Sequence, residues 1–236
     1  MIPEFLIGFG ILLCYFAVCA SCAILIRRKF AVPQELFRKL LHMILLCSLL
    51  VWVYAFRTWQ MSAAAAALFT ALVYPLLTFA QRYKGYSELL VERGRGEIRR
   101  SLVIVFFMFS LLIVICWGWL GERWLALACA YAWGFGDAAA ALVGKRFGKH
   151  GLKGRFIEGR KSVEGTAAMF LVSFAAVLIA LLVNHPGAWY AHVPVAALTG
   201  AVCAAVELYT RGGMDTLTCP LAAAAVLIPI LLMWGV

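Results

Sequence analysis

Residues 167–183 read AAMFLVSFAAVLIALLV, a run of 17 residues without a charged side chain. About 20 apolar residues in an α-helix cross the hydrocarbon core of a bilayer. This run therefore predicts a membrane-spanning helix, and the same pattern recurs on both sides of it. Apolar runs bounded by charge predict eight helices, with seven as the alternative, near residues 3–26, 40–56, 60–80, 101–120, 123–143, 164–183, 189–210 and 218–236.

The composition supports the same interpretation. Of the 236 residues, 65% are hydrophobic and only 14% are charged, far from the usage of water-soluble domains. The connections between the eight runs are too short to form a separate soluble domain. We therefore expect an all-α, polytopic transmembrane helix bundle with one integral-membrane domain, residues 1–236.

The positive charges are distributed unevenly over the connections. Of the 21 Lys and Arg residues, 19 lie in the connections after the first, third, fifth and seventh helices. By the positive-inside rule, these connections face the cytoplasm and both termini lie outside, in the inner membrane if the organism is bacterial. The formal charge of +10 then faces anionic lipid or an anionic substrate. Nucleic acid is not an expected partner, because a basic soluble fold is absent.

Eight cysteines do not predict a disulfide scaffold, because all of them fall in or against apolar runs. Cys19 and Cys22 form a CxxC pair, but a zinc site would need a second pair. We interpret most of the cysteines as small hydrophobic residues.

Ionisable side chains gather at the cytoplasmic ends of several predicted helices. Such groups are costly in a membrane and therefore indicate function. Asp137 lies in the fifth helix among glycines and alanines, and Glu207 lies near the end of the seventh helix. The others are Arg38, Lys39, His42, Glu164 and Asp215. A plain structural alternative is that these carboxylates pair with nearby Lys and Arg side chains.

The segment from Gly144 to Thr166 alternates glycine with cationic residues. Glycine allows backbone N–H groups to approach a phosphate closely, and Lys and Arg neutralise its charge. Ser162 is expected to cap the sixth helix, whose N-terminus attracts anions. The stretch 154–162 approaches a Walker A motif but has one residue too many before its Lys. Phosphate binding is the favoured interpretation, and an anchor for anionic lipid is the alternative.

Four segments resemble the membrane kinases that phosphorylate lipid alcohols with CTP: dolichol and polyprenol kinases, phytol kinase and CTP-dependent diacylglycerol kinase. The segments are RKLLH at 38–42, GDAAAALVGKRFG at 136–148, KSVEGT at 161–166, and Glu207 followed by DTLTCP at 215–220. The KSVEGT segment, with Glu164, resembles the dolichol kinase branch more than the phytol and diacylglycerol branches, in which Ala is common at the position of Glu164. Thr216 departs from the family pattern, which has Asn at that place.

The resemblance implies a phosphotransferase that moves the γ-phosphate of CTP to a lipid alcohol, with polyprenol or dolichol first and phytol or diacylglycerol as alternatives. Asp137, Glu207, Arg38 and Lys39 are the expected catalytic residues, and Asp137 or Glu207 would accept the hydroxyl proton. Asp137, Glu164 and Asp215 are the expected ligands of Mg²⁺ or another divalent cation. The expected nucleotide site comprises Gly144, Lys145, Arg146, Gly148, Lys149, Arg160, Lys161 and Ser162.

Two other functions remain open at this point. A CTP:phosphatidate cytidylyltransferase would use the same classes of substrate but release pyrophosphate, whereas a kinase releases CDP. A transporter or lipid-binding scaffold would place its charges near the membrane midplane. The residues do not distinguish CTP from ATP, and they do not identify the lipid alcohol.

Overall fold

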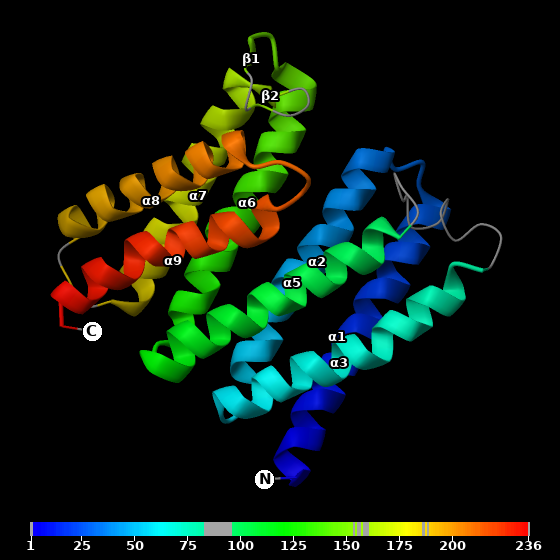
Figure 1. The fold of residues 1–236 in the computed structure, drawn as a ribbon. Helices are drawn as coiled ribbons and strands as arrows, with labels where there is room; N and C mark the ends of the chain where they lie inside the picture. The colour runs from blue at the N-terminus through cyan, green and yellow to red at the C-terminus, as the bar shows by residue number, and fades with distance from the viewer. Residues whose placement is uncertain are drawn as a thin grey trace. The chain divides into compact units, whose positions relative to one another are not determined.

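The computed structural model describes residues 2–82, 96–152, 154, 157, 161–185, 187 and 189–235. The chain forms two compact units, Met1–Gly118 and Trp119–Val236, and each is described by itself. Among the described residues, eight helices are long and apolar enough to cross a membrane. The prediction of an all-α, multi-pass membrane protein is confirmed (Figure 1).

The N-terminal unit holds α1 (Ile2–Lys29), α2 (Gln34–Tyr54), α3 (Trp59–Ala80) and α5 (Glu97–Leu112), which continues as the π-helix η1 (Ile113–Trp119). Thr58 caps α3, because its side chain accepts a hydrogen bond from the Met61 backbone N–H. α3 and α5 lie side by side (Figure 1). The core of this unit is aromatic: Phe106 packs edge-on against Trp52 and Phe69, with ring centroids 5.5 Å and 5.2 Å away.

The C-terminal unit holds α6 (Arg123–Phe147), α7 (Val163–Asn184), α8 (Trp189–Tyr209) and α9 (Asp215–Met233). A short antiparallel pair, β1 (Gly151–Leu152) and β2 (Lys161–Ser162), lies at the end where α6 finishes and α7 begins (Figure 1). α6 packs along α7, α7 along α8, and α8 along α9. The same end of this unit therefore receives the end of α6, the start of α7, the end of α8 and the start of α9.

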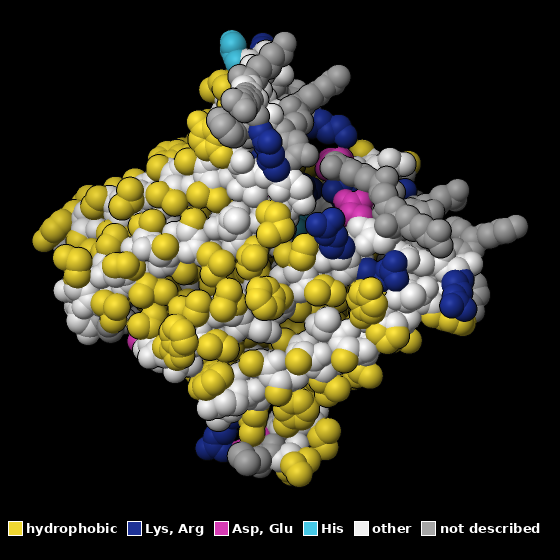
Figure 2. All heavy atoms as spheres, viewed as in Figure 1, with side chains coloured by type: hydrophobic (Ala, Val, Ile, Leu, Met, Phe, Trp, Pro, Cys, Tyr) yellow, Lys and Arg dark blue, Asp and Glu magenta, His cyan; other side chains and the backbone are white. Residues whose placement is uncertain are grey.

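The outer faces of these helices are apolar. Ile179 of α7, Leu198 of α8 and Leu232 of α9 are each at least half exposed. Figure 2 shows hydrophobic side chains covering the visible faces of α8 and α9. Without a membrane such exposure would be unfavourable, so these faces fit contact with lipid.

Most of the helices extend beyond the predicted ranges, because hydropathy marks the lipid-embedded part while the helix continues into the polar interface. For three of them the extension changes where predicted site residues lie. α2 begins at Gln34, after Pro33, so Arg38 and Lys39 lie inside it. α6 continues to Phe147, so Gly144, Lys145 and Arg146 belong to its last turns. The predicted helix ended at residue 143, so the expectation that these three residues lie in the connection after it was wrong. α9 begins at Asp215, which was expected to precede it.

Candidate active site

The end of α6 and the start of α7 approach each other through glycines. A Cβ atom on Gly165 would lie 3.0 Å from the carbonyl oxygen of Ala140 and 3.4 Å from Cα of Gly144. A Cβ atom on Gly136 would lie 2.5 Å from both Sδ of Met169 and Oγ of Ser173. Small residues permit such close packing of membrane helices. The glycines on either side of Asp137 therefore help to fix its helix against α7.

Ser162 connects β2 to α7, as the sequence predicted. Its hydroxyl accepts a hydrogen bond from the Gly165 backbone N–H at 3.1 Å, which caps the helix. A Cβ atom on Gly148 would lie 2.8 Å from this hydroxyl, so Gly148 allows the segment after α6 to pass beside the cap. The backbone N–H of Val163 also donates to the carbonyl of His150 at 3.0 Å. These contacts hold the β1–β2 pair over the first turn of α7.

Lys161 is directed from β2 toward the end of α8. Its ammonium lies 2.9 Å from Oε1 of Glu207, and it also donates to the Glu207 carbonyl oxygen. The two side chains are only 19% and 14% exposed. The Lys161 ammonium thus contacts both the carboxylate and the carbonyl oxygen of Glu207. Because water is largely excluded, this ion pair should be stronger than one on an exposed surface.

Carboxylates from three helices come together close to this ion pair. Asp137 of α6, Glu207 of α8 and Asp215 of α9 all lie close enough to the Cys219 sulfur to interact with it electrostatically. Asp137 and Lys161 also lie close enough to the Asp215 carboxylate to interact with it electrostatically. The structure thus brings together four residues that are separated by up to 78 positions along the chain.

A glycine turn makes this convergence possible. α8 ends at Tyr209 and α9 starts at Asp215. Between them, Gly212 and Gly213 adopt left-handed backbone conformations with φ of 63° and 74°. The side chains of Thr210 and Thr218 then approach to 3.2 Å between their hydroxyl oxygens. The turn therefore places the end of α8 beside the start of α9.

Glu164 is directed toward the hairpin segment. Its Oε1 lies 2.7 Å from Nδ1 of His150, and the backbone N–H of His150 lies 3.3 Å from the same oxygen. His150 itself is well exposed, with 77% of its side chain accessible. The structure places the predicted metal ligand Glu164 in this contact, on the first turn of α7.

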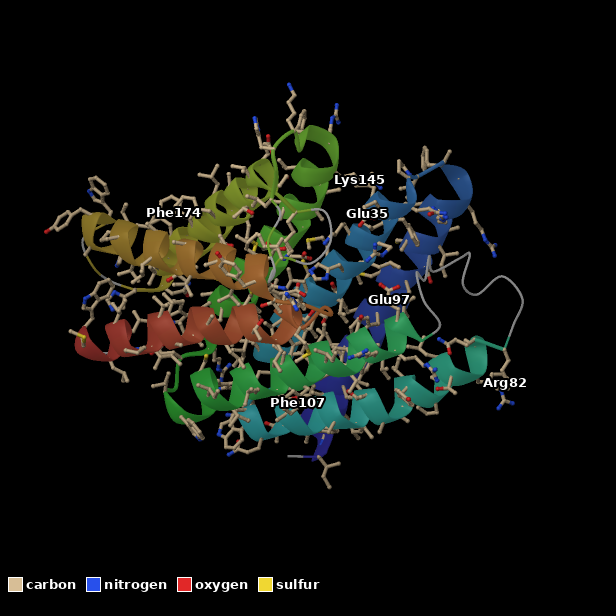
Figure 3. All side chains as sticks on the ribbon, turned by 45° about the horizontal axis from the view of Figure 1, so that its top comes forward. Glu35, Arg82, Glu97, Phe107, Lys145 and Phe174 are labelled. Carbon is tan, nitrogen blue, oxygen red and sulfur yellow. The ribbon has the colours of Figure 1, made fainter. Side chains whose placement is uncertain are left out.

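The expected nucleotide-binding residues occupy different elements. Lys145 and Arg146 are exposed in the last turn of α6, and Lys149 is exposed just after it (Figure 3 labels Lys145). Basic side chains at a helix C-terminus also complement its dipole. Arg160 lies outside the described residues.

Arg38 and Lys39 belong to the N-terminal unit. The Arg38 guanidinium lies 3.1 Å from Oε1 of Glu35 on the same helix. It lies 3.5 Å from Oε1 of Glu97, which opens α5 (Figure 3 labels both carboxylates). Arg38 therefore joins α2 to α5 within this unit. Its contacts with Glu35 and Glu97 are enough to explain the position of its guanidinium.

Comparison with known proteins identifies the kind of enzyme. The chain is 30% identical to the phytol kinase of Synechocystis sp. over 229 residues, which cover 93% of this chain and 90% of that protein. This chain belongs to the CTP-dependent lipid-alcohol kinase family. It is a phosphotransferase with an alcohol acceptor. No family model matches it, and no solved structure matches it.

Within this kinase, the described residues contain no group of three or more His, Cys, Asp or Glu side chains arranged to hold a metal ion. Asp137, Glu164 and Asp215 therefore do not form a three-ligand protein cage. Mg²⁺ usually takes only one or two carboxylates, with water and substrate phosphates completing its octahedron. The neighbouring carboxylates of Asp137 and Asp215 fit that kind of donor set.

Two residues of this candidate site were not singled out from the sequence. Trp133 donates from its indole N–H to Oδ2 of Asp215 at 3.3 Å. It lies four positions before Asp137, on the same helix face, and this spacing could have indicated it. His150 contacts Glu164 across 14 residues, and no local sequence pattern predicts that contact.

Proposed function

We propose that this kinase transfers the γ-phosphate of CTP to the hydroxyl of an isoprenoid alcohol, at a site formed by Asp137, Asp215, Glu207 and Lys161. The observation that supports this site most strongly is that Asp137, Glu207 and Asp215, from α6, α8 and α9, lie within electrostatic range of Cys219, with Glu207 paired to the shielded Lys161 ammonium. Partly buried acidic groups in membrane-spanning helices are costly and indicate function. Phosphoryl transfer needs cations and carboxylates of this kind to position the phosphates and neutralise their charge.

Asp137 and Asp215 would hold the divalent cation, Mg²⁺ in our proposal, through carboxylate oxygens. When bound, the cation would neutralise negative charge on the phosphates and orient them. The indole N–H of Trp133 would fix the carboxylate of Asp215 for this task. Glu164 would support the hairpin through His150 and need not be a ligand.

Lys161 would present its ammonium to the phosphate oxygens. Glu207 holds that ammonium through both its carboxylate and its carbonyl oxygen. We therefore assign Glu207 to positioning Lys161, and Asp137 to holding the divalent cation.

The basic residues around the hairpin would bind the rest of the nucleotide. Lys145, Arg146 and Lys149 are exposed near the end of α6, where a triphosphate could reach them from water. Arg160, Gly144, Gly148 and Ser162 complete the proposed nucleotide site, and Arg38 and Lys39 are proposed as further catalytic residues. From the positive-inside distribution we propose that this end of the C-terminal unit faces the cytoplasm and that both termini lie outside. The alcohol would enter from the bilayer.

The acceptor is proposed as an isoprenoid alcohol for two reasons. The relative from Synechocystis sp. is a phytol kinase. The KSVEGT segment with Glu164 resembles the dolichol and polyprenol kinases. Phytol and polyprenols share a branched apolar chain with one terminal hydroxyl, so one lipid-facing channel could accept either.

The test uses purified chain in detergent with CTP or ATP labelled in the γ-phosphate, Mg²⁺, and separate arms containing phytol, a polyprenol or diacylglycerol. Label on phytol or polyprenol together with release of CDP is expected. Release of pyrophosphate would favour a cytidylyltransferase. Transfer from ATP but not from CTP would refute the proposed donor, and label on diacylglycerol alone would refute the proposed acceptor.

A further inference from the structure

Two histidines lie together at the end of α7 that is remote from the proposed kinase site. His185 directly follows α7, and His192 lies in the first turn of α8. Their ring centroids are 5.6 Å apart, and the rings are nearly perpendicular. His192 is buried, with 1% of its surface accessible, and His185 is partly exposed.

Three of the four ring nitrogens of this pair are buried without a hydrogen-bond partner among the described residues. Both nitrogens of His192 and Nδ1 of His185 are buried, and none of the three has a partner among the described residues. A neutral imidazole carries one donor and one acceptor nitrogen. Leaving such a group buried and unpartnered costs about 1–3 kcal/mol, and most buried polar atoms avoid that cost. The arrangement therefore points to a ligand that interacts with these nitrogens.

One nitrogen from each ring faces the same place beside Gly187. An atom at the position of a Cβ on Gly187 would lie 2.9 Å from Nε2 of His192 and 3.4 Å from Nδ1 of His185. Glycine leaves this position open. The Trp234 ring packs against both imidazoles, with centroids 5.3 Å and 5.7 Å away, and closes another side. Since an indole N–H is only a donor, Trp234 cannot supply an acceptor.

We propose that His185 and His192 bind a divalent transition-metal ion of the Zn²⁺ class, through Nδ1 and Nε2 respectively, with water completing the coordination. Imidazole nitrogens suit Zn²⁺, Ni²⁺ and Cu²⁺, whereas Mg²⁺ prefers oxygen ligands. Among the described residues no third His, Cys, Asp or Glu side chain joins this pair in a metal-binding group, so the proposed ion has two protein ligands. The ion would join the α7–α8 turn to α8. This proposal does not depend on the proposed kinase site.

Equilibrium dialysis tests the site directly. The protein carries no polyhistidine tag, is stripped with a chelator, and is dialysed against Zn²⁺ with excess Mg²⁺ present. One tightly bound zinc ion per chain is expected, and it should be lost in the double variant His185→Asn, His192→Asn. The matched control His150→Asn removes a histidine elsewhere and should keep the ion. Equal zinc binding by the double variant and the wild type would overturn the proposal, and so would no binding by the wild type.

A second measurement needs no substitution and so does not depend on whether a variant folds. Diethylpyrocarbonate modifies accessible histidines, and mass spectrometry of peptides locates the modification. Zinc should protect His185 several-fold while leaving His150 reactive. Equal modification of His185 with and without zinc would contradict the site. Neither readout uses kinase activity, so failure here and failure of the proposed function can be told apart.

Discussion

The ammonium of Lys161 lies 2.9 Å from Oε1 of Glu207, although 46 positions separate the two residues along the chain. Lys161 belongs to β2, directly before α7, and Glu207 belongs to the last turn of α8. Both side chains are largely shielded from water. The pair therefore ties the hairpin segment to the helix end that carries one of the site's carboxylates.

Replacing Lys161 by Met should lower both stability and activity. The substitution keeps most of the apolar stem but leaves the shielded carboxylate of Glu207 without its cation. We expect a loss of about 1–3 kcal/mol in unfolding free energy and at least a tenfold loss of transfer rate. Thermal denaturation in detergent and initial rates check both expectations.

The double variant Lys161→Met, Glu207→Gln separates the two effects. Since Gln carries no charge, this variant should recover part of the lost stability but none of the lost activity. If it recovered full activity, Lys161 would have no role toward the phosphates beyond neutralising Glu207.

Trp133→Phe removes only the indole N–H that reaches Asp215. An aromatic ring still fills the buried position, so the thermal midpoint should change little. The carboxylate of Asp215 would lose an oriented partner, and we expect the Mg²⁺ concentration for half-maximal rate to rise about three- to tenfold. Trp124→Phe, another buried tryptophan of α6, is the matched control and should leave this concentration unchanged.

Gly148→Ala tests the close passage beside the α7 cap. The added Cβ would lie 2.3 Å from the Gly144 carbonyl oxygen and 2.8 Å from the Ser162 hydroxyl, so the backbone must shift. A loss of about 1–3 kcal/mol in stability is expected. Gly151→Ala, three residues later, has no atom within 4 Å of the new Cβ and should keep the wild-type midpoint. Equal midpoints for the two variants would show that the passage is not tightly packed.

Much of the fold could be predicted from the sequence because lipid imposes a simple length rule. Apolar runs located all eight spans, and they placed Asp137 inside α6 and Glu207 near the end of α8. The ends of the helices were harder to predict, because α2 and α6 continue through charged residues outside the apolar layer. This is why Lys145 was expected in a loop but lies in a helix.

The individual residues of the candidate site could be singled out from the sequence, but the contacts between them could not. Charge patterns singled out Lys161, Glu207 and Asp215, yet their meeting depends on how α6, α8 and α9 pack together. The contact between Trp133 and Asp215 spans 82 positions, and hydropathy carries no information about such pairs. The sequence also does not indicate the pair His185 and His192, because the evidence for a site there is the burial of ring nitrogens without hydrogen-bond partners among the described residues.

Asp137→Asn provides the most direct test of the proposed site. The side chain keeps its size and loses its charge, so the variant should fold with a thermal midpoint close to that of the wild type. With γ-labelled CTP, Mg²⁺ and phytol or polyprenol, we expect its rate of label transfer to fall at least a hundredfold. A folded Asp137→Asn protein that transfers phosphate at the wild-type rate would contradict the account.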